Sequence, residues 1–127
     1  MRTLDRRAIA IGAVWHLVLA VPFGGLVAVL KSNDAPGHES NLWVVAAFLA
    51  VLVAPTVGGY EAGKRQPRQA LVHSAVAVGL ASGAIVIVRF LVWLVTRDQL
   101  HIVTLFLYLY ITVCIGVVGG YVAFRRR

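Results

Sequence analysis

Four long apolar runs constrain the fold of this chain more than any other feature. They cover about residues 8–30, 42–60, 70–95 and 102–124, and short polar or basic connections separate them. A helix needs ~20 apolar residues to cross a hydrocarbon core of ~30 Å. Because backbone groups must be satisfied within each span in lipid, each run is expected to be helical. The sequence therefore predicts one all-α membrane domain over residues 1–127, a four-transmembrane-helix bundle.

The overall composition agrees with a membrane protein and argues against a soluble one. Of the 127 residues, 60% are hydrophobic and 13% are charged, and the mean hydropathy is +0.84. The net charge is +7, but the basic residues stand at the ends of the apolar runs. This placement indicates membrane topology and contact with anionic lipid headgroups, and no nucleic-acid partner is expected.

The basic residues are distributed unevenly over the polar segments. The N-terminus carries Arg2, Arg6 and Arg7, the central connection carries Lys64, Arg65 and Arg68, and the C-terminus carries Arg125, Arg126 and Arg127. The first connection carries only Lys31, and the third carries only Arg97. The positive-inside rule therefore predicts that both termini and the central connection are cytoplasmic. The prevalence of arginine over lysine, with much Ala, Val and Gly, indicates a high-GC bacterium and its plasma membrane. The two hairpins then form parallel repeats.

Two short patterns recur and support this repeat. Residues 57–65 (VGGYEAGKR) match residues 118–126 (VGGYVAFRR), and the segment ending in His16 echoes the one ending in His73. We interpret the Gly-Gly-Tyr pattern as a way of ending a span. Its glycines would allow close packing, its tyrosine would lie at the interface, and the basic residues would stay inside.

Small residues at spacings of four or multiples of four mark candidate helix-packing faces, because they let helix backbones approach closely in lipid. These residues lie in the first, third and fourth runs: Gly12, Ala20 and Gly24; Ala75, Gly79 and Gly83; Gly116 and Gly120. We expect them to be buried between helices. The alternative is that Gly and Ala are simply common in such a chain.

Two histidines lie within the spans, and ionisable groups there are functional candidates. His16 and His73 occupy matching places in the repeat, which suggests a bis-imidazole haem or metal site, or a proton-carrying pair. The alternative is a neutral histidine that is hydrogen-bonded to a helix carbonyl or to Tyr60 or Tyr121. Metal sites usually have more ligands than two histidines, so no metal is expected.

Arg89 is the third candidate. At 1.5 Å per residue it lies ~32 Å from Arg68, close to the outer interface, and six apolar residues follow it. The third run is longer than a perpendicular span, so it should either tilt or break. Arg89 is then either interfacial and paired with one of three acidic residues, or part of an anion-conducting site. The acidic residues are Asp34, Glu39 and Asp98.

Hydroxyl groups could add to a polar site in the fourth run. Tyr108 and Tyr110 lie beside Thr104 and Thr112, where they could serve an interhelical contact or a bound headgroup. The sequence holds no nucleophile with a base, no glycine-rich phosphate loop and no Cys/His cluster, so no enzymatic activity is expected.

The segment Gly58-Gly59-Tyr60-x-Ala62-Gly63-Lys64-Arg65, followed by Ala70-x-x-His73, resembles a hairpin in small uncharacterised four-helix membrane proteins of actinobacteria and related bacteria. That resemblance implies no activity. Three hypotheses follow from the residues. The first is a non-enzymatic accessory subunit that packs with other membrane subunits or with itself. The second is a small transporter or channel lined by His16, His73 or Arg89, and the third is a haem-binding membrane anchor using His16 and His73.

Overall fold

The computed structural model describes residues 4–33, 41–97 and 101–126, and it confirms the all-α four-helix bundle. The helices are α1 (Arg6–Ser32), α2 (Leu42–Arg65), α3 (Ala70–Thr96) and α4 (Ile102–Arg125), with a short 3-10 turn, η1 (Pro67–Gln69), before α3. All four helices are long and apolar enough to cross a membrane. The chain is thus a multi-pass integral membrane protein by helix length and composition.

The end of the second helix differs from the sequence expectation. We expected the second span to end at Tyr60, but α2 continues through Gly58, Gly59 and Tyr60 to Arg65. The Gly-Gly-Tyr pattern therefore lies inside a helix and does not end one. Its glycines allow α2 to pack closely against neighbouring helices. The long third run does not break, since α3 is continuous to Thr96 and ends where Arg97 takes a left-handed φ of 56°.

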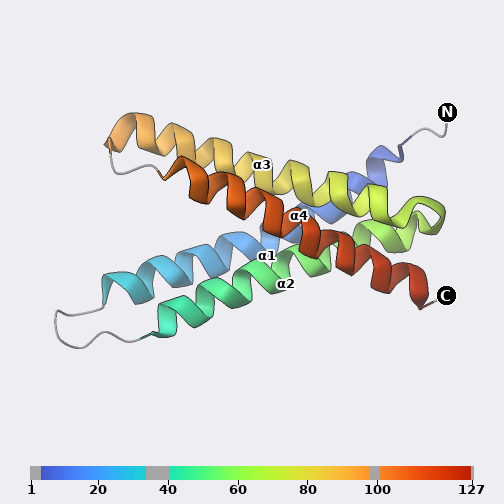
Figure 1. Cartoon of the computed structure of the whole chain (residues 1–127), viewed down its shortest axis with the longest axis horizontal. Coiled ribbons are helices and arrows are strands. Elements are labelled where there is room, and N and C mark those ends of the chain that lie inside the picture. Colours follow the sequence, from blue (N-terminus) through green and yellow to red (C-terminus); the bar gives the residue numbers. More distant parts are fainter. Residues whose placement is uncertain (1–3, 34–40, 98–100, 127) are drawn as a thin grey trace.

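The two hairpins, α1–α2 and α3–α4, pack closely at one end of the molecule and diverge toward the other (Figure 1). We call the first the closed end, where the start of α1, the end of α4 and η1 lie, and the second the open end. Helices α2 and α3 contact each other and each outer helix, whereas α1 and α4 share no contact in the described structure. Helices α2 and α3 therefore form the centre of the bundle.

Glycines hold α2 and α4 together in the closed half. A Cβ atom added to Gly59 would lie 2.0 Å from the carbonyl oxygen of Gly116, and one on Gly119 would lie 2.2 Å from that of Thr56. Real Cβ atoms do not approach backbone this closely, so only glycine permits the crossing. The Ser74 hydroxyl donates to the Gly59 carbonyl oxygen over 2.6 Å and adds a hydrogen bond from α3.

A second close crossing joins α1 to α2. A Cβ atom on Gly12 would lie 2.6 Å from the Cβ of Ala62 and 2.7 Å from the Gly58 carbonyl oxygen. One on Gly58 would lie 2.8 Å from the Cβ of His16. This crossing within the first hairpin and the α2–α4 crossing between the hairpins both lie in the closed half, and the hairpins diverge beyond it (Figure 1).

The candidate packing residues fall into two groups. Gly12, Gly116 and Gly120 lie at close helix crossings, whereas Gly24 and Gly83 have no described atom within 4 Å of an added Cβ. The remaining three lie between these extremes: Gly79 is in ordinary contact with Val113, Ala75 is half-buried, and Ala20 lines a cavity. The buried face of α3 instead carries His73, Ser74, Ala77, Val78, Ala81 and Ser82.

Candidate functional site

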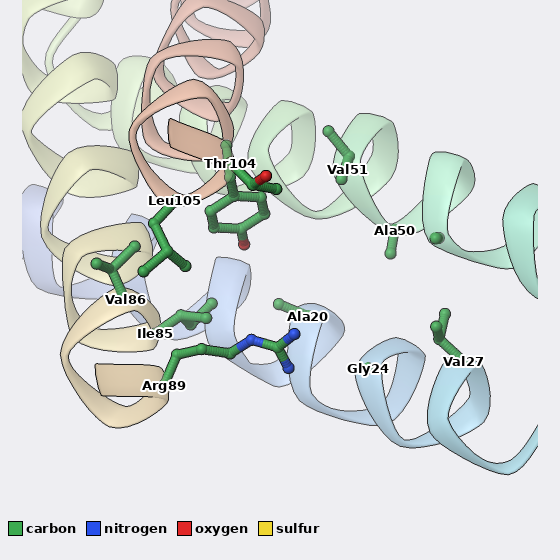
Figure 2. Close-up of a pocket in the computed structure, with 12 residues that line it drawn as sticks. Ala20, Gly24, Val27, Ala50, Val51, Ile85, Val86, Arg89, Thr104 and Leu105 are labelled. Atoms are coloured by element: carbon green, nitrogen blue, oxygen red, sulfur yellow. The ribbon is translucent and has the colours of Figure 1, made fainter. Parts of the chain in front are cut away.

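A cleft lies between the two hairpins at the open end, with a volume of about 330 Å³ (Figure 2). All four helices line it, and its lining residues are Ala20, Gly24 and Val27 of α1, Ala47, Ala50 and Val51 of α2, Ile85, Val86 and Arg89 of α3, and Thr104, Leu105 and Tyr108 of α4. The cleft exists because the glycine crossings bring the helices together only in the closed half. Its walls are apolar except for one guanidinium and two hydroxyl-bearing side chains.

Arg89 supplies the charge in this cleft. Its side chain reaches from α3 toward α1, and the guanidinium lies near Ala20 and Gly24 (Figure 2). Among the described residues it has no hydrogen-bond or salt-bridge partner. The three acidic partners considered from the sequence, Asp34, Glu39 and Asp98, lie outside the described residues. Within the described structure, the guanidinium donors therefore face the cleft.

The depth of Arg89 bears on its role. It lies seven residues before the end of α3, or ~10 Å along the helix axis, and the intervening residues are apolar. One of them, Val95, is 84% exposed in the isolated protein. Arg89 therefore lies within the apolar length of the helix, where placing a charge is costly and usually serves a function.

His73 lies at the closed end and ties three segments together. Its Nε2 accepts a hydrogen bond from the Asp5 backbone N–H over 2.9 Å, and its Nδ1 donates to the Gln69 carbonyl oxygen over 3.0 Å. Asp5 in turn caps α1 and accepts from the Gln66 amide over 3.0 Å. That hydrogen bond, followed by one from the Ala8 backbone, holds the pKa of Asp5 below its ordinary value. Both ring nitrogens of His73 are thus occupied, and the contact of Nε2 with Asp5 links α1 to α3.

His16 occupies a different environment. It lies three turns beyond Asp5 along α1, or ~16 Å, so the structure does not bring it together with His73. The residue is 0% exposed, and neither ring nitrogen has a hydrogen-bond partner among the described residues. The pairing required for a bis-imidazole haem is therefore not present in this arrangement.

A second buried polar group lies at a similar position on α3. The Ser82 hydroxyl is fully buried and interacts with the side chain of Tyr108 on α4. Ser82 precedes the cleft residue Val86 by one helical turn, and His16 precedes the cleft residue Ala20 by one turn. Both polar groups are therefore one turn closer to the closed end than the residues that line the cleft.

The basic residues expected to mark topology gather at the closed end. Lys64, Arg65, Arg68, Arg125 and Arg126 are all exposed there, and Arg127 lies outside the described residues. Glu61 forms a salt bridge to Lys64 at 3.9 Å and another to Arg65. Most of this positive charge stays available to anionic headgroups, and the orientation of the bundle in the membrane stays a prediction.

Sequence reasoning identified part of this site. Of the four hydroxyl-bearing residues that the sequence suggests for an interhelical contact or a bound headgroup, Thr104 and Tyr108 line the cleft. Tyr110 is 70% exposed, and the Thr112 hydroxyl donates to the Tyr108 carbonyl oxygen. Ser82 and the Asp5–Gln66 contact were missed. A serine on a face rich in small residues gives no signal of its own, and a contact across sixty residues of chain needs the fold.

No cluster of three or more His, Cys, Asp or Glu side chains suited to a metal ion occurs among the residues that the structure describes. Comparisons of the chain with protein families, with curated proteins and with solved structures found no match. The resemblance of the Gly58–His73 hairpin to small actinobacterial membrane proteins stays a prediction. The fold and the cleft therefore define a class, a multi-pass membrane protein with an arginine in a cleft between two helical hairpins.

Proposed function

We propose that this protein is a non-enzymatic membrane protein that binds an anionic ligand in the open-end cleft, as a small transporter or channel does. The observation that carries the proposal is Arg89, whose guanidinium lies in a cavity that all four helices line (Figure 2). A guanidinium presents a planar set of donors that matches a carboxylate or phosphate. A charge in this position is expected to meet a ligand.

The rest of the cleft also favours an anion. Its described lining residues include no carboxylate, so nothing there competes with a ligand for the guanidinium. Thr104 and Tyr108 of α4 add hydroxyl donors to the lining. The apolar remainder keeps the local dielectric low, which strengthens a charge-assisted hydrogen bond.

The basic closed end supports an orientation for this site. Because Lys64, Arg65, Arg68 and the terminal arginines gather there, we place the closed end in the cytoplasm of a bacterial cell. The cleft then faces the outer side of the plasma membrane. Cysteine labelling from either side of the membrane tests this placement, with single cysteines introduced at Arg68 and Arg97 in a C114S background.

Binding measurements on Arg89 variants test the function. Arg89→Gln should weaken binding of an anion about ten- to hundredfold, the size expected for a lost hydrogen bond to a charged group. Arg89→Lys should restore part of it. Arg97→Gln is the matched control, because Arg97 is at the same end but stacks on Trp93, with the guanidinium carbon 6.0 Å from the ring centre. Equal binding by the Arg89→Gln and Arg97→Gln proteins would contradict the proposal.

A second candidate function is that of a membrane subunit that packs with partners or with itself. It is favoured by Gly25 and Gly83, which have no described atom within 4 Å of an added Cβ and so offer close approach to another helix. Mild-detergent purification should then yield an oligomer or a bound partner, and Gly83→Leu should release it. A monomer both in mild detergent and after crosslinking in native membranes would contradict this role.

A further inference from the structure

A second hollow adjoins the cleft on the lipid-facing side of α3 and α4. It is a groove of about 390 Å³, and the described residues that line it are all apolar, among them Phe90, Phe106 and Leu109. Val86 and Leu105 line both the groove and the cleft. Only these two side chains are common to both hollows, and they lie between α3 and α4 beside Arg89 (Figure 2).

We infer that the ligand of the cleft is an anionic lipid. Its carboxylate or phosphate headgroup binds Arg89, and its hydrocarbon chain passes between α3 and α4 into the groove. This inference rests on the proposed function and names the chemical class of the ligand.

Charge complementarity and continuity both point to this occupant. Arg89 and Phe90 are consecutive on α3, and the first lines the cleft while the second lines the groove. A positive group thus adjoins the apolar groove, which matches a lipid, in which an anionic headgroup is attached to a hydrocarbon chain. The Phe90 ring packs against Trp93, with ring centres 5.3 Å apart, which helps to hold this wall in place.

The groove is also accessible from the membrane. Two of its lining residues, Ile87 and Phe106, are 60% and 70% exposed in the isolated protein. A lipid can therefore enter sideways from the bilayer and need not pass through water. The ligand then has two contacts, because Arg89 binds the headgroup and the apolar groove packs against the chain, and both contribute to its affinity.

Four probes separate the headgroup from the chain. We would add hexadecyl phosphate, hexadecanoate, hexadecanol or inorganic phosphate to the full-length protein in neutral detergent and measure binding by native mass spectrometry. The two anionic amphiphiles should bind at least about tenfold more tightly than hexadecanol or inorganic phosphate, and Arg89→Gln should remove that advantage. Arg97→Gln should leave it unchanged. Helix content and elution volume must match the wild type in each variant.

Photocrosslinking locates the chain. A hexadecanoate analogue with a diazirine in its chain should label the tryptic peptides 90–97 and 98–125, which contain Phe90, Phe106 and Leu109, in preference to peptide 8–31 of α1. Leu109→Trp, which fills the groove, should reduce this labelling while lowering affinity less than Arg89→Gln does.

The outcomes separate this inference from the proposed function. If inorganic phosphate binds as tightly as hexadecyl phosphate and still depends on Arg89, the lipid inference is overturned and the anion site stands. If no probe depends on Arg89, both are overturned. If binding depends on Arg89 but the diazirine labels peptide 8–31 instead, the chain does not lie in the α3–α4 groove and the inference is also overturned.

Discussion

Replacing Gly59 by alanine should force α2 and α4 apart where they cross. The new Cβ would lie 2.0 Å from the carbonyl oxygen of Gly116 and 2.7 Å from its carbonyl carbon, whereas ordinary contact begins at 3.4 Å. Both are backbone atoms, so no side-chain rotation relieves the clash, and the helices must separate by about 1.4 Å along the shorter contact. Overpacking of this kind costs about 1–3 kcal/mol.

The control is Gly25→Ala in α1. An added Cβ there has no described atom within 4 Å, and alanine is a better helix former than glycine by up to ~1 kcal/mol. This variant should therefore be as stable as the wild type or slightly more stable. Equilibrium unfolding in mixed micelles, followed by helix content, measures both free energies of unfolding. The described crossing of α2 and α4 is refuted if Gly59→Ala costs no more stability than Gly25→Ala.

Three further predictions concern buried or capping polar groups. The pKa of Asp5 is lowered, first by the Gln66 amide, so its stabilisation is present above its ordinary value of 3.8 and is lost as pH falls through the lower folded-state value. Gln66→Ala should raise that pKa, and a carboxyl-carbon NMR titration that shows no rise would contradict the contact. Ser74→Ala should lower the free energy of unfolding by ~0.6–1 kcal/mol, because it removes the hydrogen bond to the Gly59 carbonyl oxygen. An unchanged free energy of unfolding would show that this hydrogen bond does not stabilise the bundle. His16→Leu should be neutral or stabilising in the same assay, because neither ring nitrogen is hydrogen-bonded in the described structure; a clear loss of stability would reveal a missing partner.

The four helices were predictable because the signal for each is local. A run of apolar residues long enough to cross a membrane defines a helix whatever its neighbours are, and all four expected runs are helical. The helix ends were harder to predict. Gly58 and Gly59 look like a helix stop in the sequence, but they lie inside α2 because α1 and α4 pack against them.

Helix rotation explains why spacing did not identify the packing faces uniformly. Gly12 and Gly24 both belong to a pattern of small residues at multiples of four, yet Gly12 lies at a crossing and Gly24 faces open space. The spacing indicates that residues share a helix face, but it does not say where along that face the neighbouring helix departs. Here the hairpins diverge beyond the closed half (Figure 1), so the same stripe is buried at one end and lines a cleft at the other.

The two histidines and the arginine depended even more on tertiary structure. His16 and His73 are equivalent in the sequence repeat, but His73 lies near the start of α3, where the Asp5 backbone can donate to it. The ring nitrogens of His16 have no hydrogen-bond partner among the described residues. Arg89 could be interpreted from the sequence as interfacial or as part of an anion site, and its placement in a four-helix cleft required the divergence of the hairpins.

The most direct test of the anion site is a solid-state NMR contact between arginine and ligand. The protein would be labelled with ¹³C at arginine Cζ and reconstituted in a bilayer of neutral glycolipid that contains no phosphorus, with hexadecyl phosphate as the only source of that nucleus. Phosphorus-to-carbon dephasing should then be clearly smaller in the Arg89→Gln protein than in the wild type, and Arg97→Gln should leave it at the wild-type value. Equal dephasing in the wild-type and Arg89→Gln proteins would show that the other arginines, and not the cleft, bind the anion.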